Sequence, residues 1–187
     1  LPSRGLGDVY KRQFIIMSSE LRVDKIIPTG GVPTGGGGGI VQVKQITHSG
    51  YIKYNTNSFA AGTKADSSTG DYSITITPKF NTSKILVSFE SMYDSYQNQR
   101  TFVTLYRTVA GGTATHVLGD NVGAGRGMCE IWQNSTRIQA HCSGQFLDEP
   151  STTNAVTYTV YANTSTGDFY LGLYDNIKFM HAMEVSA

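Results

Sequence analysis

The chain of 187 residues is long enough for one ordinary domain with a sizeable core and a short appendage. Its fifteen basic and fourteen acidic residues leave a formal net charge of +1, and neither sign gathers into a block. Nucleic acids and anionic membranes both require a concentrated basic face, so this charge distribution argues against both partners. No apolar run approaches the roughly 20 residues of a membrane-spanning helix, so membrane insertion is not expected.

Residues 1–16 are expected to be a leader that is foreign to the natural protein. They lack the apolar stretch and the small-residue cleavage site of a secretory signal. Asp8 to Gln13, DVYKRQ, resembles instead the translated end of an adapter used to prepare sequencing libraries. The natural start is then Met17.

Residues 17–39 are predicted to be an attachment segment and a glycine-rich joint, because SSELRVDKIIPTGG leads into a stretch that ends in five consecutive glycines. A phosphate-binding loop requires G-x-x-x-x-G-K-[ST], but Gly39 is followed by Ile40, Val41 and Gln42, so that function is excluded. Two interpretations stay open. The glycines are either a flexible joint or a place where several backbones approach closely without side chains between them.

Residues 40–187 are predicted to form one head domain of short strands. Apolar and polar residues alternate in several runs, and turn-like clusters separate these runs. The apolar members are, in chain order, Ile74, Ile76, Ile85, Val87, Phe89, Val156, Tyr158, Val160, Phe169, Leu171, Leu173, Met183 and Val185. No segment of useful length keeps a helical period. The prediction is therefore an all-β protein, a jelly-roll-like antiparallel β-sandwich.

The stretch MCEIWQNSTRIQAHC predicts a hairpin whose register can be calculated. A two-residue loop at Ser135 and Thr136 places Cys129 opposite Cys142 and Glu130 opposite His141. The apolar face then carries Cys129, Ile131, Ile138, Ala140 and Cys142, and the other face carries Glu130, Trp132, Gln139 and His141. The cysteines are close enough for a disulfide, but two free thiols in a reducing cytosol are the preferred interpretation.

Several stretches, taken in order, resemble one group of proteins. ELRVDKIIPTGG with GGGGGIVQVKQ, then ITPKFNTSKILVSFE, FLDEPSTTNAVTYTVYANTS and the ending MEVSA, are similar to small virion or tail-fibre-associated proteins of marine bacteriophages. These stretches cover most of the chain after Met17. The tyrosine-rich SMYDSYQNQRTF and the stretch GRGMCEIWQNSTRIQAHC depart from the group's commoner pattern, so the resemblance assigns no ligand.

The resemblance implies a fold, an assembly and a location. The fold would be a jelly-roll head like those of tumour necrosis factor and complement proteins, assembled as a homotrimer and joined to other virion or tail-fibre proteins. The attachment segment is similar to units of fibre shafts in which three chains wind together, and it comprises Leu21, Val23, Ile26, Ile27 and Pro28. The protein would belong to the virion and be assembled in the host cytoplasm.

The sequence offers little for catalysis, so we expect neither an enzyme nor a cofactor. There is no G-x-S-x-G motif, and no metal-ligand spacing among the histidines, which are His48, His116, His141 and His181. Asp148 and Glu149 are adjacent, so their carboxylates would point to opposite sides. A polysaccharide depolymerase stays open as a less favoured alternative, with carboxylates from Asp94, Asp120 and Asp175. Glu130 and His141 could bind a metal, but a surface hydrogen-bonded pair is preferred.

Two patches are candidates for binding a sugar or a protein epitope. The first combines flat aromatic faces with planar hydrogen-bonding groups, namely Tyr93, Asp94, Tyr96, Gln97, Asn98 and Arg100. The second is Trp132 with Arg137, near the hairpin turn. The competing interpretations are polar turn residues for the first patch and a tryptophan packed at a subunit interface for the second.

The combined prediction is a non-enzymatic phage structural protein, a trimeric head that serves assembly, capping or attachment to a host surface or glycan. A closed trimer would bury an apolar strand face without leaving a growing edge. The aromatic residues that could supply this face, although some must fill the core, are Phe102, Tyr106, Tyr158, Tyr161, Tyr170 and Tyr174. A monomeric carbohydrate-binding module is the main alternative.

Overall fold

The computed structural model describes residues 39–55, 60–61, 63–64, 72–96, 98–118, 127–134, 137–172 and 178–186. All regular secondary structure in these ranges is β-strand. Within them, no helix is long and apolar enough to cross a membrane. The predicted attachment segment (Leu21, Val23, Ile26, Ile27, Pro28) and the glycines up to Gly38 lie outside the described residues.

The first sheet is antiparallel and is centred on the long strand β6, with β10 along one side of it. On the other side, β13 and β12 pair with successive parts of β6; β1 continues the sheet beyond β13, and β2 and β4 continue it beyond β12. The bounds of these strands are β1 (Ile40–His48), β2 (Ile52–Tyr54), β4 (Thr63–Lys64), β6 (Lys84–Tyr96), β10 (Arg137–Asp148), β12 (Phe169–Leu171) and β13 (Lys178–Val185).

The second sheet is also antiparallel and is built around β11 and β7, which pair along nine residues. The strands β5 and β3 flank β11, and β9 and β8 flank β7. The bounds of these strands are β3 (Ala60–Ala61), β5 (Ser73–Ile76), β7 (Gln99–Val109), β8 (Thr115–His116), β9 (Cys129–Gln133) and β11 (Val156–Thr164).

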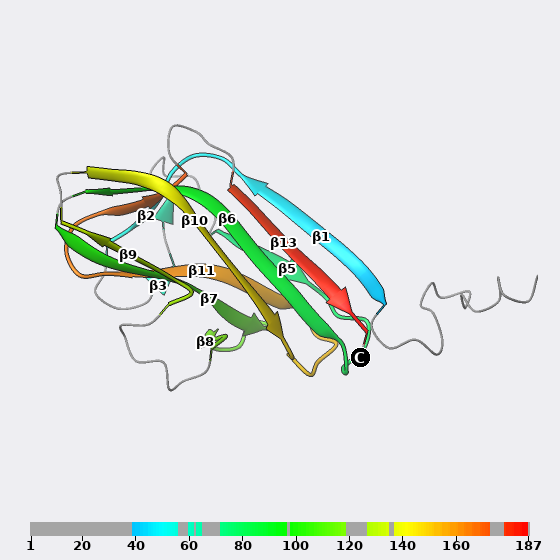
Figure 1. The fold of residues 1–187 in the computed structure, drawn as a ribbon. Helices are drawn as coiled ribbons and strands as arrows, with labels where there is room; N and C mark the ends of the chain where they lie inside the picture. Colours follow the sequence, from blue (N-terminus) through cyan, green and yellow to red (C-terminus); the bar gives the residue numbers. More distant parts are fainter. Residues whose placement is uncertain are drawn as a thin grey trace, which may run out of the picture.

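The connections between the long strands are those of a jelly roll. The order β1–β13–β6–β10 in one sheet faces β5–β11–β7–β9 in the other, and the chain changes sheets repeatedly as it passes from β5 to β6, β7, β9, β10, β11 and β13. Figure 1 shows β10, β6, β13 and β1 side by side in one layer, with β9, β7, β11 and β5 in the layer behind. The predicted fold class, an all-β jelly-roll-like sandwich, is therefore confirmed.

The core lies between the two sheets, and strand alternation fills it. Ile85, Val87 and Phe89 on β6 are at most 1% exposed, as the alternation predicted. Each such side chain contributes roughly 1.5–3 kcal/mol by leaving water. On β13 the alternation has the opposite phase to the predicted one, because Met180 and Ala182 are buried. The partly exposed residues there are Met183 and Val185. Leu173 lies outside the described residues.

Two core tyrosines join the sheets through their hydroxyl groups. Tyr54 on β2 of the first sheet donates to the carbonyl oxygen of Val160 in the second sheet, over 3.1 Å. Tyr72 lies just before β5 of the second sheet, and its hydroxyl oxygen lies 2.8 Å from the carbonyl oxygens of Glu90 and Phe179 in the first. Burial raises the pKa of Tyr72 well above its usual range, so the hydroxyl stays protonated and can donate.

A third tyrosine joins the sheets through a buried carboxylate. Tyr158 on β11 donates its hydroxyl to Asp148 at the end of β10, over 2.7 Å. Arg107 on β7 donates Nη1 to both oxygens of the same carboxylate, at 2.8 and 3.0 Å. Asp148 is only 5% exposed, so its charge depends on these two donors. Burial raises the pKa of Tyr158, so this hydroxyl also remains a donor.

The predicted hairpin pairing is wrong, because β9 and β10 belong to different sheets. β9 pairs with β7, with Cys129 opposite Val103, and β10 pairs with β6, with Cys142 opposite Ser91. The chain crosses from one sheet to the other between the two strands, as jelly-roll connectivity requires. The inward and outward faces are largely as predicted. The exception is Ile138, which is 37% exposed near the start of the edge strand β10.

Replacement of Gly144 is expected to destabilise the sandwich. This residue lies on β10 opposite Phe89, and a Cβ atom at position 144 would come within 2.4 Å of the Phe89 Cε1 atom. The Phe89 ring, which is 1% exposed, would have to move from its packed position. Gly144→Ala should therefore lower the free energy of unfolding by about 1–3 kcal/mol, measured by urea titration with circular dichroism. Ser143→Ala, at the exposed neighbouring position, is the control and should change it little. Equal stability of Gly144→Ala and the natural chain would contradict the prediction.

Candidate functional site

Four side chains gather on the outer face of the second sheet, where β7 and β9 pair. Arg100 lies opposite Trp132, and Phe102 lies opposite Glu130. Because successive side chains of a strand alternate between faces, these four share the face that points away from the core. We call them the tryptophan cluster.

The guanidinium group of Arg100 is the centre of the tryptophan cluster. Its Cζ atom lies 4.8 Å from the ring centroid of Phe102 and 5.5 Å from that of Trp132. Its Nε atom donates to Glu130 Oε1 over 2.6 Å. The aromatic rings and the carboxylate together fix the plane of the guanidinium. Trp132 is 70% exposed, so one edge of the cluster is a bare aromatic surface.

A second charged pair lies on the outer face of the first sheet. Arg137 on β10 donates Nε and Nη2 to the two oxygens of Asp94 on β6, at 2.9 and 2.6 Å. Asp94 is 2% exposed. Both of its oxygens are occupied, so this carboxylate serves the sheet as an ion-pair partner. The other aspartates considered for a depolymerase, Asp120 and Asp175, lie outside the described residues.

The members of the two predicted binding patches are combined differently in the structure. Arg100 and Trp132 come together on the second sheet, whereas Asp94 and Arg137 come together on the first. Trp132 and Arg137 therefore do not share a patch, because the chain changes sheets between them.

The remaining members of the first predicted patch are dispersed. Tyr93 is 6% exposed, and its ring packs in the core with its centroid 5.8 Å from that of Phe169, so it is not accessible to a ligand. Asn98 is exposed, and its carbonyl accepts a hydrogen bond from Thr166. The side chain of Tyr96 and the whole of Gln97 lie outside the described part of the chain.

Glu130 and Phe102 belong to the site although the sequence reasoning did not place them there. The predicted partner of Glu130, His141, lies on the other sheet, 3.0 Å from Glu90. The missed signal was the two-residue spacing, Arg100 to Phe102 and Glu130 to Trp132, which puts each pair on one face of a strand. Among the described residues no group of His, Cys, Asp and Glu could hold a metal ion.

The aromatic residues proposed for an outer face are divided among three places. Tyr106 and Tyr161 stack on the outer face of the second sheet, with ring centroids 4.1 Å apart, alongside Phe102. Tyr158 fills the core, and Tyr170 lies opposite Asp94 on the outer face of the first sheet. Tyr174 lies outside the described residues.

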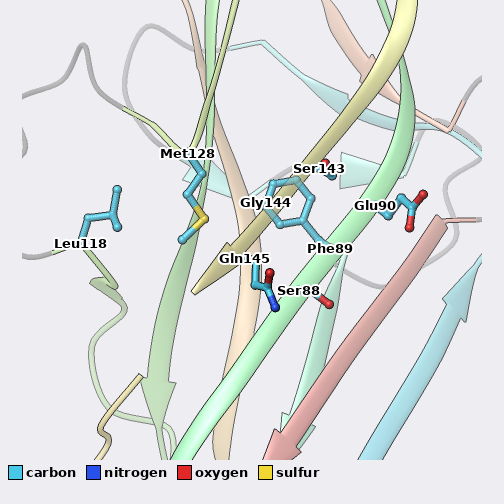
Figure 2. Close-up of a pocket in the computed structure, with 8 residues that line it drawn as sticks. All are labelled: Ser88, Phe89, Glu90, Leu118, Met128, Ser143, Gly144 and Gln145. Carbon is cyan, nitrogen blue, oxygen red and sulfur yellow. The ribbon is translucent and has the colours of Figure 1, made fainter. Parts of the chain in front are cut away.

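A groove of about 530 Å³ opens at the β10 edge of the sandwich. Figure 2 shows the Phe89 ring against Gly144, with Met128 and Leu118 on the side of the second sheet. The residues that line the groove are Ser88, Phe89, Glu90, Leu118, Met128, Ser143, Gly144 and Gln145.

The two cysteines meet across the sandwich, between β9 of one sheet and β10 of the other. Both are free thiols; Cys142 is buried and Cys129 is partly buried. A hydrogen bond from Cys142 lowers the pKa of Cys129 to about 7, and the same contact together with burial raises the pKa of Cys142. Cys129 is therefore the thiol that ionises first.

Comparisons with known proteins leave the family open. No protein-family model matches the chain, and no curated protein matches it. Among solved structures, it is similar to a chain in the structure of the infectious bursal disease virus Gx strain, with a TM-score of 0.40 and 12% sequence identity. The match covers 78% of this chain but only 37% of the other. A likeness of this extent carries no argument about function.

Alkylation kinetics should distinguish the two thiols. Cys129 is expected to react with iodoacetamide at a rate that rises with a midpoint near pH 7, because the thiolate is the nucleophile and its pKa is about 7. Cys142→Ala removes the stabilising hydrogen bond and should move this midpoint up toward the ordinary cysteine value of about 8.5. Intact-mass spectrometry over time gives the rates, and Cys129→Ala, which leaves only buried Cys142, should react slowly. An unchanged midpoint in Cys142→Ala would contradict the assignment.

Proposed function

We propose that this protein is a structural component of a virion appendage, a homotrimeric jelly-roll head that joins other virion or tail-fibre proteins. The resemblance of its sequence to marine phage proteins suggested this role, and the jelly-roll fold is compatible with it. The observation that carries the proposal is the edge strand β1, which leaves three large aliphatic side chains exposed to water.

β1 is an unusual edge for a protein that acts as a monomer. Ile40, Val43 and Ile46 are 58%, 54% and 38% exposed, although a lone strand edge is normally protected by charge, shortness or a cover. Among the described strands, β1 forms a ladder only with β13. Three exposed aliphatic side chains on a nine-residue edge strand are therefore expected to be covered by another chain.

A second and a third copy of this chain are the proposed cover. The net charge of +1 means that copies repel one another little when they approach. Between β1 and β5 a groove of about 610 Å³ lies next to the exposed side chains and offers a recess for a neighbouring copy. A closed ring of copies covers every such edge, whereas an open chain of copies would leave one growing end.

The exposed Trp132 favours one alternative, a monomeric carbohydrate-binding module. In that case the tryptophan cluster would bind sugar without any assembly, and β1 would remain exposed. The mass of the protein in solution separates the two functions, because the first requires three chains and the second requires one.

The full chain should have three times the chain mass in light scattering on a sizing column. Val43→Glu should convert this trimer to a monomer, because burying one unpaired carboxylate costs about 3–5 kcal/mol. Thr153→Glu adds the same charge at an exposed turn position far from β1 in sequence, and it should remain trimeric. Circular dichroism should show that both variants keep the β-sheet spectrum. A monomeric natural chain would refute the trimer, and a trimeric Val43→Glu would refute β1 as its interface.

A further inference from the structure

We infer that the tryptophan cluster binds an uncharged sugar unit of a glycan, with the sugar ring on Trp132 and its hydroxyls on Arg100 and Glu130. This goes beyond the proposed structural role, because it gives the head a ligand. The chemistry itself depends only on the four residues of the cluster.

Trp132 provides the flat surface. It is the only tryptophan of the chain, and at 70% exposure it is the most exposed of the large hydrophobic side chains in the described part. An aromatic ring left in water forgoes the stability that burial would provide. A pyranose ring has one face lined with C–H groups, and such a face can cover an indole while its hydroxyls remain at the rim.

Arg100 provides fixed donors beside this surface. Its Nε atom donates a hydrogen bond to Glu130, but its two terminal amino groups have no hydrogen-bond partner among the described residues. Phe102 and Trp132 hold the guanidinium plane, and the side chain is 48% exposed. The donors are therefore oriented before any ligand arrives, which reduces the entropy lost on binding.

Glu130 provides hydrogen-bond acceptors and balances the charge of Arg100. Its Oε1 atom accepts from Arg100, and its Oε2 atom has no partner among the described residues. The pair has no net charge. A sugar hydroxyl both donates and accepts, so adjacent hydroxyls can contact the arginine donors and the carboxylate together. A uronic or sialic acid would meet both the Arg100 guanidinium and the Glu130 carboxylate, so the pair offers it no net charge attraction, and we assign a neutral sugar.

The comparison with Asp94 and Arg137 supports this assignment. There the arginine contacts both oxygens of a carboxylate that is 2% exposed, so this carboxylate is not accessible to a ligand. In the tryptophan cluster the contact uses one nitrogen and one oxygen, and both partners are more than 40% exposed. The first sheet thus carries a two-contact ion pair with a buried carboxylate, and the second carries a solvent-exposed ion pair next to an exposed aromatic ring.

The single tryptophan makes the test direct, because its fluorescence reports on the site itself. The full chain would be titrated with the neutral polysaccharides dextran, mannan and galactan, and with alginate as the acidic counterpart. At least one neutral polysaccharide should give a saturable blue shift of the emission that does not depend on salt. Arg100→Met and Glu130→Gln should weaken this binding at least about tenfold, as loss of hydrogen bonds to charged groups implies. Arg137→Lys, on the other sheet, is the matched control and should bind normally.

Three results would overturn the inference. The first is no shift with any of the neutral polysaccharides. The second is a shift with alginate alone that disappears at high salt, which would mean binding by charge. The third is an emission that is already blue-shifted and protected from acrylamide in the free protein, which would place Trp132 in a subunit contact.

The mass measurement keeps this inference distinct from the proposed assembly. A monomer that binds dextran or another neutral polysaccharide would refute the trimer and leave the sugar site standing. A trimer that binds none of them would do the reverse.

Discussion

Three buried tyrosine hydroxyls hold the two sheets at one spacing and one lateral position, and the rest of the structure depends on this constraint. Tyr54, Tyr72 and Tyr158 each place a ring in the core and reach an acceptor on the opposite sheet. An unsatisfied buried hydroxyl costs about 1–3 kcal/mol, so a slip of either sheet would lose several such bonds at once. Because the acceptors lie on β11, β6, β13 and β10, the constraint acts on the centre of both sheets and on the edge strand β10. That fixed frame positions the outer faces on which the candidate site lies.

The sequence was sufficient for the fold class but not for the pairing of β9 with β10. Alternation in runs such as Ile85 to Phe89 depends on one buried face, which any sandwich strand has. The hairpin register assumed that strands joined by a short turn are hydrogen-bonded to each other. In a jelly roll the same turn can carry the chain to the other sheet, and the inward residues of both strands still face each other. Cys129 and Cys142 therefore lie near each other across the core, and not as the cross-strand pair that was predicted.

The same crossing explains why the candidate site was only half predicted. The segment from Tyr93 to Arg100 is continuous in sequence, but β6 ends and β7 begins within it. Its residues are therefore distributed to the core, to the outer face of the first sheet and to the outer face of the second. Arg100 lies opposite Trp132 because β7 pairs with β9. The two segments are about thirty residues apart, and no local sequence pattern predicts that they pair. Long-range pairing, rather than composition, decides which polar and aromatic side chains form one surface.

The proposed assembly and the proposed sugar site use opposite edges of the sandwich. β1 lies over β5 at one edge, whereas β9, which carries Trp132, lies near β10 at the other. Contacts made through β1 would thus leave the tryptophan cluster facing outward on every copy. A shallow platform with one aromatic ring and one ion pair gives weak binding for a single sugar unit. Three such platforms held in one ring, against a surface with many identical sugars, raise the overall affinity without any new contact, because each later binding event becomes intramolecular. On this argument, assembly through β1 and weak sugar binding by the tryptophan cluster would both be needed for firm attachment to a surface.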